Sequence, residues 1–193
     1  WYCGCHAFAA KRDEPIAEFV EALLVEIDRV ADAAAARRVT EIHWGGGTPN
    51  ILSPARFAAI ADHLDQRFDL FSLERHAVEI DPRILTEAHA EAFAAAGVNR
   101  VSLGVQDLDE RVQQGIGRIQ PFETVRHAVD MLREAGIEAL SFDLMYGLPH
   151  QTRDSVRETA ERAASLSPAR FSVFSYAHVP WFKTSQKLMD DHA

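Results

Sequence analysis

Short strand-like segments alternate with amphipathic helical segments along almost the whole chain, and this alternation restricts the fold more than any other feature. After a helical pattern over residues 14–38, strand-like segments follow at 40–44, 76–80, 100–105, 139–145 and 171–176. Helical periodicity lies between them, at 53–68, 84–96, 107–115, 121–135 and 152–166. Such a pattern predicts an α/β protein with a parallel sheet covered by helices. It leaves open whether the sheet closes into a barrel.

One domain is the expectation for residues 1–193, because a chain of this length with 47% hydrophobic and 25% charged residues can bury a single sizeable core. Since the chain starts at Trp1 and its first residues form no targeting peptide, we expect it to begin inside a longer protein. A net charge of −9 without a Lys/Arg block argues against a nucleic-acid partner. No apolar run approaches the ~20 residues that cross a bilayer, so no membrane partner is expected.

Glycines and polar side chains gather directly after the predicted strands, where β/α proteins keep their chemistry. The carboxyl ends of parallel strands share one edge of a sheet, so these segments are expected to form one site. The segments are Gly45-Gly46-Gly47-Thr48-Pro49, Glu79-Ile80-Asp81-Pro82-Arg83, Gly104-Val105-Gln106-Asp107, Asp143-Leu144-Met145-Tyr146-Gly147-Leu148-Pro149 and Tyr176-Ala177-His178-Val179-Pro180.

Four of the five segments have a plainer interpretation as well. The glycine triplet exposes backbone groups to a ligand or forms a simple tight turn. Asp81 holds a ligand or only caps the next helix. Asp143 stands in an apolar run, where a buried charge needs a partner; Arg118 is the candidate, or else forms a surface salt bridge. His178 is more often a structural histidine than a general base.

Cys3 and Cys5 are the two cysteines of the chain, and a disulfide across a single residue would be strained. One interpretation is a pair of reduced thiols in a cytosolic protein. The other is that Cys3 is a thiolate ligand whose partners lie elsewhere.

Taken together, the motifs resemble the radical S-adenosylmethionine superfamily and, within it, the oxygen-independent coproporphyrinogen III oxidases. That superfamily binds a [4Fe–4S] cluster through three cysteines spaced C-x3-C-x2-C. Trp1-Tyr2-Cys3 looks like the end of this signature, with Cys3 as the third ligand and Cys5 as an extra, non-ligating cysteine. The first two ligand cysteines are absent, and the resemblance otherwise runs from Trp1 to about Lys187.

The resemblance implies a partial (βα)6 radical-SAM barrel without its first strand, a [4Fe–4S] cluster and two molecules of S-adenosylmethionine. Residues 1–193 would then be the core domain, beginning inside the cluster-binding loop, with the C-terminal domain absent. By motif position, contacts to the first S-adenosylmethionine match Tyr2, Gly46 and Glu79. Contacts to the second match Gly47, Thr48, Gln106, Arg118, Asp143 and Ala177. The planar fork of Arg118 suits a ligand carboxylate.

The activity implied by the resemblance is the oxygen-independent oxidative decarboxylation of coproporphyrinogen III to protoporphyrinogen IX, by 5′-deoxyadenosyl radical chemistry in haem and porphyrin biosynthesis. The implied partners are this substrate and a reducing electron donor protein, and the implied location is the cytoplasm. Because the substrate is acidic and the chain carries a charge of −9, local arginines or residues outside the chain are expected to hold the propionates.

Two alternatives stand beside the oxidase. The first is a related haem chaperone, although Cys5, the Glu79-Ile80-Asp81-Pro82-Arg83 segment and Tyr176-Ala177-His178 favour the oxidase. The second is that the chain as given is an inactive β/α fragment, while its parent is the oxidase.

Overall fold

Five parallel strands form one sheet in the computed structural model, which describes residues 2–3, 12–34 and 38–189. The strands pair in the order in which they occur along the chain, and each lies within one residue of its predicted bounds at either end. They are β1 (Glu41–Trp44), β2 (Arg75–Ile80), β3 (Arg100–Gln106), β4 (Ala139–Tyr146) and β5 (Arg170–Ser175). The predicted α/β fold with a parallel sheet is confirmed.

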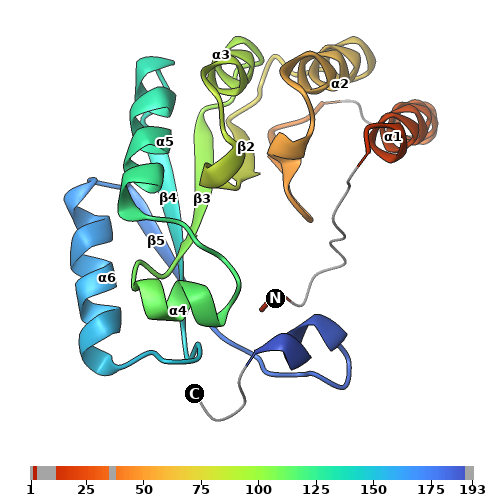
Figure 1. The fold of residues 1–193 in the computed structure, drawn as a ribbon. Coiled ribbons are helices and arrows are strands. Elements are labelled where there is room, and N and C mark those ends of the chain that lie inside the picture. The colour runs from red at the N-terminus through yellow and green to blue at the C-terminus, as the bar shows by residue number, and fades with distance from the viewer. Residues whose placement is uncertain (1, 4–11, 35–37, 190–193) are drawn as a thin grey trace.

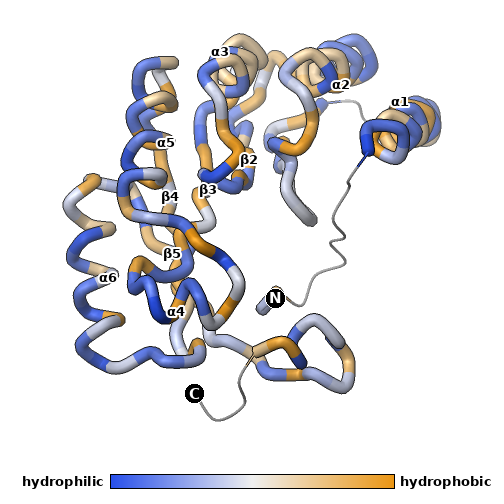
Figure 2. Tube along the Cα trace, viewed as in Figure 1, coloured by the Kyte–Doolittle hydropathy of each residue, from blue (hydrophilic) through white to orange (hydrophobic). Residues whose placement is uncertain are grey.

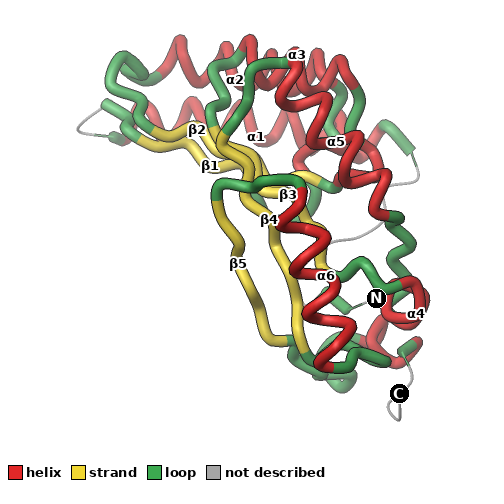
Figure 3. Tube along the Cα trace, turned by 90° about the vertical axis from the view of Figure 1, so that its left-hand side faces the viewer, coloured by secondary structure: helices red, strands yellow, loops and turns green. Residues whose placement is uncertain are grey.

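Helices cover one side of this sheet and leave the other side open, as Figures 1 and 3 show. The α-helices are α1 (Glu14–Ala33), α2 (Pro54–Arg67), α3 (Glu87–Ala95), α4 (Glu110–Gly115), α5 (Phe122–Glu134) and α6 (Arg153–Ser165). Short 3-10 helices are η1 (Pro49–Ile51), η2 (Pro82–Ile84) and η3 (Thr184–Leu188). Figure 2 shows apolar and polar residues alternating along the helices, as expected where one face packs and the other meets solvent.

Local capping explains where the helices begin and where the predicted bounds were wrong. The Ser53 side chain accepts a hydrogen bond from the Arg56 backbone N–H, so the predicted cap of α2 is confirmed. The single helix expected at 84–96 is instead divided, because Asp81 caps η2 and Thr86 caps α3 separately. The first helix ends earlier than predicted, at Ala33, and Arg38 instead forms a parallel bridge with Asp69.

The helix-facing sides of the strands form the hydrophobic core. Alternate residues of β3 and β4 are almost fully buried there: Val101, Leu103, Val105, Leu140, Phe142 and Leu144. Phe57 of α2 packs against Trp44 and Phe93, with ring centroids 4.2 and 4.6 Å apart. This dry layer fixes the strands and therefore the loops that follow them.

On the opposite side, polar residues of four strands line a shared cavity. They are Glu79 of β2, Ser102 of β3, Asp143 of β4 and Ser172 of β5, and each is at least partly exposed. In the described part of the chain no strand precedes α1, and β1 and β5 are the two edges of an open sheet. This arrangement agrees with the expected partial barrel that lacks its first strand. Among the described residues, no helix has the length and apolar character required to cross a bilayer.

Candidate functional site

The loops at the carboxyl ends of the strands meet, as predicted, and Tyr2 lies with them. Tyr2 packs against the cluster of Val112, Ile116, Leu148 and Met189. Burial raises the pKa of the Tyr2 phenol, and the charges of Arg118, Asp81, Arg83 and Asp143 also act on it. Tyr2, the end of β2, the loop after β3 and the end of β4 therefore belong to one rim.

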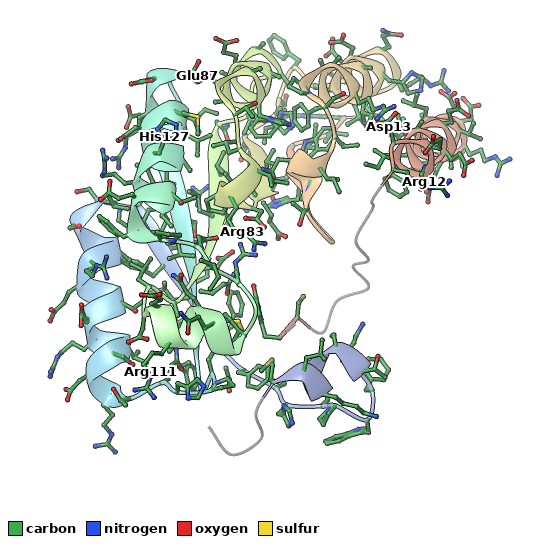
Figure 4. The ribbon with its side chains drawn as sticks, in the orientation of Figure 1. Arg12, Asp13, Arg83, Glu87, Arg111 and His127 are labelled. Atoms are coloured by element: carbon green, nitrogen blue, oxygen red, sulfur yellow. The ribbon has the colours of Figure 1, made fainter. Side chains whose placement is uncertain are left out.

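Asp81 is the electrostatic centre of this rim. Its carboxylate accepts a hydrogen bond of 2.6 Å from Arg83 Nη2 and one of 3.2 Å from Arg118 Nη1. Burial by itself would raise the pKa of Asp81, but the Arg83 hydrogen bonds and the Arg118 charge outweigh it and hold that pKa below its usual value. Arg83 lies in η2, directly after β2, and Figure 4 shows its side chain on the inner side of the ribbon, toward the middle of the picture.

The guanidinium group of Arg118 is fixed in place by two different acceptors. Besides its bond to Asp81, its Nη2 donates to the Gly104 carbonyl at 2.9 Å. Its Nε is buried and has no hydrogen-bond partner among the described residues. A buried N–H without an acceptor is costly in a finished site, so this atom fits a ligand oxygen such as that of an amino acid carboxylate.

Arg118 does not pair with Asp143, so that sequence-based alternative is wrong, and so is the surface salt bridge, since the Arg118 side chain is only 13% exposed. Asp143 instead accepts the hydroxyl hydrogen bond of Ser102, at 3.0 and 3.1 Å from its two oxygens. Burial is the main cause of the raised pKa of Asp143, and the nearby Glu79 charge adds to it. The hydrogen bonds of Ser102 and Ser172 and the charge of Arg170 act on this pKa in the opposite direction. Asp143 is thus a half-buried acid that faces the open side of the sheet.

The glycine loop after β1 gives a ligand room to approach the backbone. A Cβ on Gly45 would lie 3.2 Å from Oε2 of Glu79, so a side chain there would press on that carboxylate. Gly46 has a φ of +91°, which favours glycine, and no atom lies within 4 Å of the Cβ position of Gly46 or Gly47. Thr48 ends the loop as the cap of η1, without a side-chain cap bond. Backbone groups next to the Glu79 carboxylate suit the amino acid and ribose parts of a nucleoside ligand.

Gln106 and Ala177 complete the predicted set. Gln106, at the end of β3, has a φ of +66° and lies where the pairing register with β4 shifts. Its Nε2 lies 2.9 Å from the position that a Cβ on Gly104 would occupy. Gly104 is also the residue whose carbonyl accepts the hydrogen bond from Arg118. Ala177 is exposed, and its carbonyl accepts a hydrogen bond of 3.1 Å from Gln186.

Gln186 is an organising residue that sequence reasoning missed. It is fully buried, and its Nε2 also donates to the Tyr2 carbonyl at 2.9 Å, while its Oε1 accepts from the Val179 backbone at 2.6 Å. One amide therefore ties the N-terminal segment to the loop after β5. Asn50 was missed in the same way; it forms two hydrogen bonds with the Asp81 backbone, at 2.9 and 3.0 Å. Neither residue lies in a recognisable motif, so the sequence held no signal for them.

The residues of this chain do not form a complete iron–sulfur site. Cys3 is in a disulfide in this structure, and Cys5 lies outside the described residues. Across residues 2–3, 12–34 and 38–189, no group of three or more His, Cys, Asp or Glu side chains is placed to hold a metal ion. A cluster on three thiolates needs more cysteines than the two in this sequence.

Comparison with protein families defines the class. Residues 1–163 match the Radical SAM superfamily, and the chain belongs to that superfamily. Within it, the chain is similar to coproporphyrinogen oxidases. It is 50% identical, over all of its length, to the oxygen-independent coproporphyrinogen III oxidase of Bradyrhizobium diazoefficiens, and 40% identical to that of Paracoccus denitrificans. The chain spans 43% of each of these relatives.

Solved structures agree with the sequence comparison. The coproporphyrinogen III oxidase of Escherichia coli, described as a radical SAM enzyme, superposes with a TM-score of 0.93 at 35% identity, over 99% of this chain and 44% of that one. A radical S-adenosylmethionine methyltransferase from Kitasatospora setae matches 80% of this chain and 30% of its own, with a TM-score of 0.62 at 22% identity, and therefore shares the fold. The resemblance drawn from the sequence motifs is confirmed.

Proposed function

We propose that the complete protein containing this chain is an oxygen-independent coproporphyrinogen III oxidase, which decarboxylates two propionate groups of coproporphyrinogen III to give protoporphyrinogen IX. The observation that carries this proposal is the 50% identity, over the whole chain, to an enzyme of that name. The meeting of the rim residues around Asp81 and Arg118 supports it, because such an enzyme needs a preformed site for an amino acid zwitterion and a ribose.

S-adenosylmethionine supplies the radical chemistry when it is bound, and the chain supplies its binding groups. We assign Tyr2, Gly46 and Glu79 to the first molecule. We assign the second to Gly47, Thr48, Gln106, Arg118, Asp143 and Ala177. In this assignment the Glu79 carboxylate pairs with the ammonium group of the first molecule. In the second molecule, Arg118 binds the carboxylate through its buried Nε–H, and the half-buried Asp143 accepts a hydrogen bond from a ribose hydroxyl.

Cys3, once reduced, is assigned as one ligand of the [4Fe–4S] cluster, and the remaining thiolates have to come from beyond the two cysteines of this sequence. For the same reason, the 193-residue chain alone is expected to retain no stable cluster after anaerobic reconstitution and desalting. The reducing electron donor protein, the cytoplasmic location and the assignment of residues 1–193 as a core domain remain parts of the proposal.

The test is an Arg118→Ala substitution in the complete protein, reconstituted without oxygen. Iron content should be unchanged, because Arg118 provides no iron ligand. The affinity for S-adenosylmethionine should fall on the order of 10-fold or more, since a charge-assisted hydrogen bond is lost, and 5′-deoxyadenosine and decarboxylated porphyrin should fall together. Arg126→Ala is the control, because Arg126 pairs with Glu123 and Asp130 on the exposed face of α5.

Each result has a separate meaning. An unmutated protein that binds haem tightly but forms no decarboxylated product would support the haem chaperone instead. Normal turnover by Arg118→Ala would leave the oxidase standing and remove the assignment of the second S-adenosylmethionine to this rim. Arg118→Lys keeps the charge beside Asp81 and loses the fork, so an intermediate affinity would identify the guanidinium geometry as the cause.

A further inference from the structure

Two arginines stand on the open, inner face of the sheet, away from the rim. Arg100 begins β3 and Arg170 begins β5, and both line a cavity of about 260 Å³. Glu79 and Asp143, which we assign to S-adenosylmethionine, line the same cavity. The cavity therefore joins the cofactor site to a cationic wall made by the two arginines. Arg170 is level with Glu79 in the strand register, and Arg100 lies nearer the amino ends of the strands.

The strand register places this wall at a defined depth. Arg170 pairs with Ser141, and the next inward residue of β5, Ser172, pairs with Asp143. Two residues of a strand advance roughly 7 Å, which is close to the reach of an extended arginine side chain. Arg100 lies one such step nearer the amino ends than Arg170. Ser141 pairs with both Arg170 and Ser102, and Arg100 precedes Ser102 by two residues along β3. A ligand between the two levels can touch both the cofactor and the arginines.

Neither guanidinium group forms an ion pair within the described residues, although the charge of Arg170 acts on nearby Asp143 in the direction that lowers its pKa. Within the described part of the chain, the Arg100 side chain has no hydrogen bond or ion pair, and only its backbone pairs with the neighbouring strands. Arg170 donates only from Nε, to Ser141 Oγ at 3.3 Å, which leaves its outer N–H groups available. The neighbouring Arg75 differs, because its Nη1 pairs with Glu41 at 3.2 Å. In a chain with a net charge of −9, two guanidinium groups facing one cavity form a local site for carboxylates.

An apolar surface adjoins these arginines. Phe174 faces inward from β5 in register with Met145, lines the same cavity and is 54% exposed. A large exposed aromatic ring above a cationic wall fits a ligand with a flat apolar part and a carboxylate arm.

We propose that Arg100 and Arg170 bind a carboxylate of the tetrapyrrole substrate, whose pyrrole ring packs against Phe174, and so position one propionate arm inside the sheet beneath S-adenosylmethionine. This inference rests on the proposed function and adds the residues that hold the substrate. A cavity of about 260 Å³ admits one pyrrole with its arm, while the rest of the macrocycle lies outside on the open side of the sheet.

The experiment measures binding and turnover separately in the complete protein. Coproporphyrin III, the stable fluorescent oxidised form of the substrate, is the binding probe, and coproporphyrinogen III is the substrate. We expect Arg100→Gln and Arg170→Gln each to weaken coproporphyrin III binding about 10-fold and to raise KM more than they lower kcat. Arg100→Lys and Arg170→Lys should recover part of the affinity, and Arg126→Gln should bind as the unmutated protein does. Unchanged affinity for S-adenosylmethionine reports that each variant has folded.

The outcomes separate this proposal from the proposed function. If both Gln variants retain S-adenosylmethionine binding and bind coproporphyrin III normally, the carboxylate site is overturned, whether or not the protein is an oxidase. If the unmutated protein forms no decarboxylated product but the Gln variants still weaken coproporphyrin III binding, the oxidase fails and the carboxylate site stands. If one Gln variant does not fold, the Lys variant at the same position replaces it in the test. The site is overturned if that folded Lys variant has unchanged KM and unchanged probe affinity and the Gln variant of the other arginine also binds normally.

Discussion

The two faces of β3 and β4 are built from alternate residues of the same strands, yet they meet opposite environments. On the helix side, Leu103 and Phe142 are fully buried in an apolar layer. On the open side, Ser102 and Asp143 are half-buried and joined to each other by hydrogen bonds. Residues that stabilise the fold and residues that bind a ligand are therefore only one position apart along a strand, since successive side chains point to opposite faces.

Burial also has opposite effects on free energy on the two faces. Burying Phe142 stabilises the fold by removing apolar surface from water. Burying the Asp143 carboxyl disfavours its charged form, as its raised pKa shows. The inner face, on the open side of the sheet, therefore serves ligand binding, while the outer face, on the helix side, stabilises the fold.

The largest expected effect is on the outer face. Phe142→Ala should lower the free energy of unfolding by about 3–5 kcal/mol, because it leaves a cavity in the fully buried layer. Phe174→Ala removes the same side chain from the inner face of the adjacent strand, where the ring is 54% exposed, and should cost about 1 kcal/mol or less. Urea unfolding of both variants measures the two values. Equal losses would break the distinction between the faces.

Asp143→Asn should leave stability at neutral pH undiminished and weaken S-adenosylmethionine binding on the order of 10-fold. Because the pKa of Asp143 is raised in the folded state, its stabilising contribution is present below the unfolded pKa of about 3.9 and is lost as pH rises through the folded pKa. The unmutated protein should thus lose stability relative to Asp143→Asn as the pH rises above about 4. Unfolding curves at several pH values, with calorimetric titration of S-adenosylmethionine, test both parts. A loss of several kcal/mol at pH 7 would show that the inner face also supports the fold.

His76 is a polar exception on the outer face. It is 2% exposed, and its Nε2 accepts a hydrogen bond of 2.7 Å from Trp44 Nε1, which requires the neutral ring. Burial lowers the pKa of His76, so the stability it contributes is present above the unfolded pKa of about 6.5 and is lost as pH falls below it. The decline should reach at most about 1.4 kcal/mol per pH unit. His76→Gln should show a shallower decline between pH 7 and pH 5, and a parallel decline would assign the effect to other histidines.

The smallest effect lies in the glycine loop, which belongs to neither face. Gly46→Ala should cost about 1 kcal/mol, because a φ of +91° is unfavourable for a residue with a Cβ. Gly47→Ala has open space and no positive φ, and should change stability by about 0.5 kcal/mol or less. The difference between their unfolding midpoints is the measurement. A costly Gly47→Ala would mean that the space beside this loop is occupied in solution.

The sequence predicted the sheet well because the strands are short, separated by clear helices and bounded by turns. It also predicted which loops share the rim, since parallel strands end on one edge. It failed on the partner of Arg118. Asp81 directly follows β2 and Asp143 lies within β4, so both carboxylates belong to the same part of the sheet, and only the distances across it favour Asp81. Gln186 could not be found either, because a buried amide that links Tyr2 to Ala177 depends on two loops meeting in space.

The strand order of the sheet also has a consequence for how the molecule folds. Strands that are neighbours in the sheet are also consecutive along the chain, so no strand pairing requires a part of the chain that is synthesised much later. Each new strand can dock on an edge that already exists, at a modest cost in loop-closure entropy. The sheet can thus form in the order in which the ribosome synthesises its strands, from β1 to β5. Folding rates should depend most on the early β1–β2–β3 region.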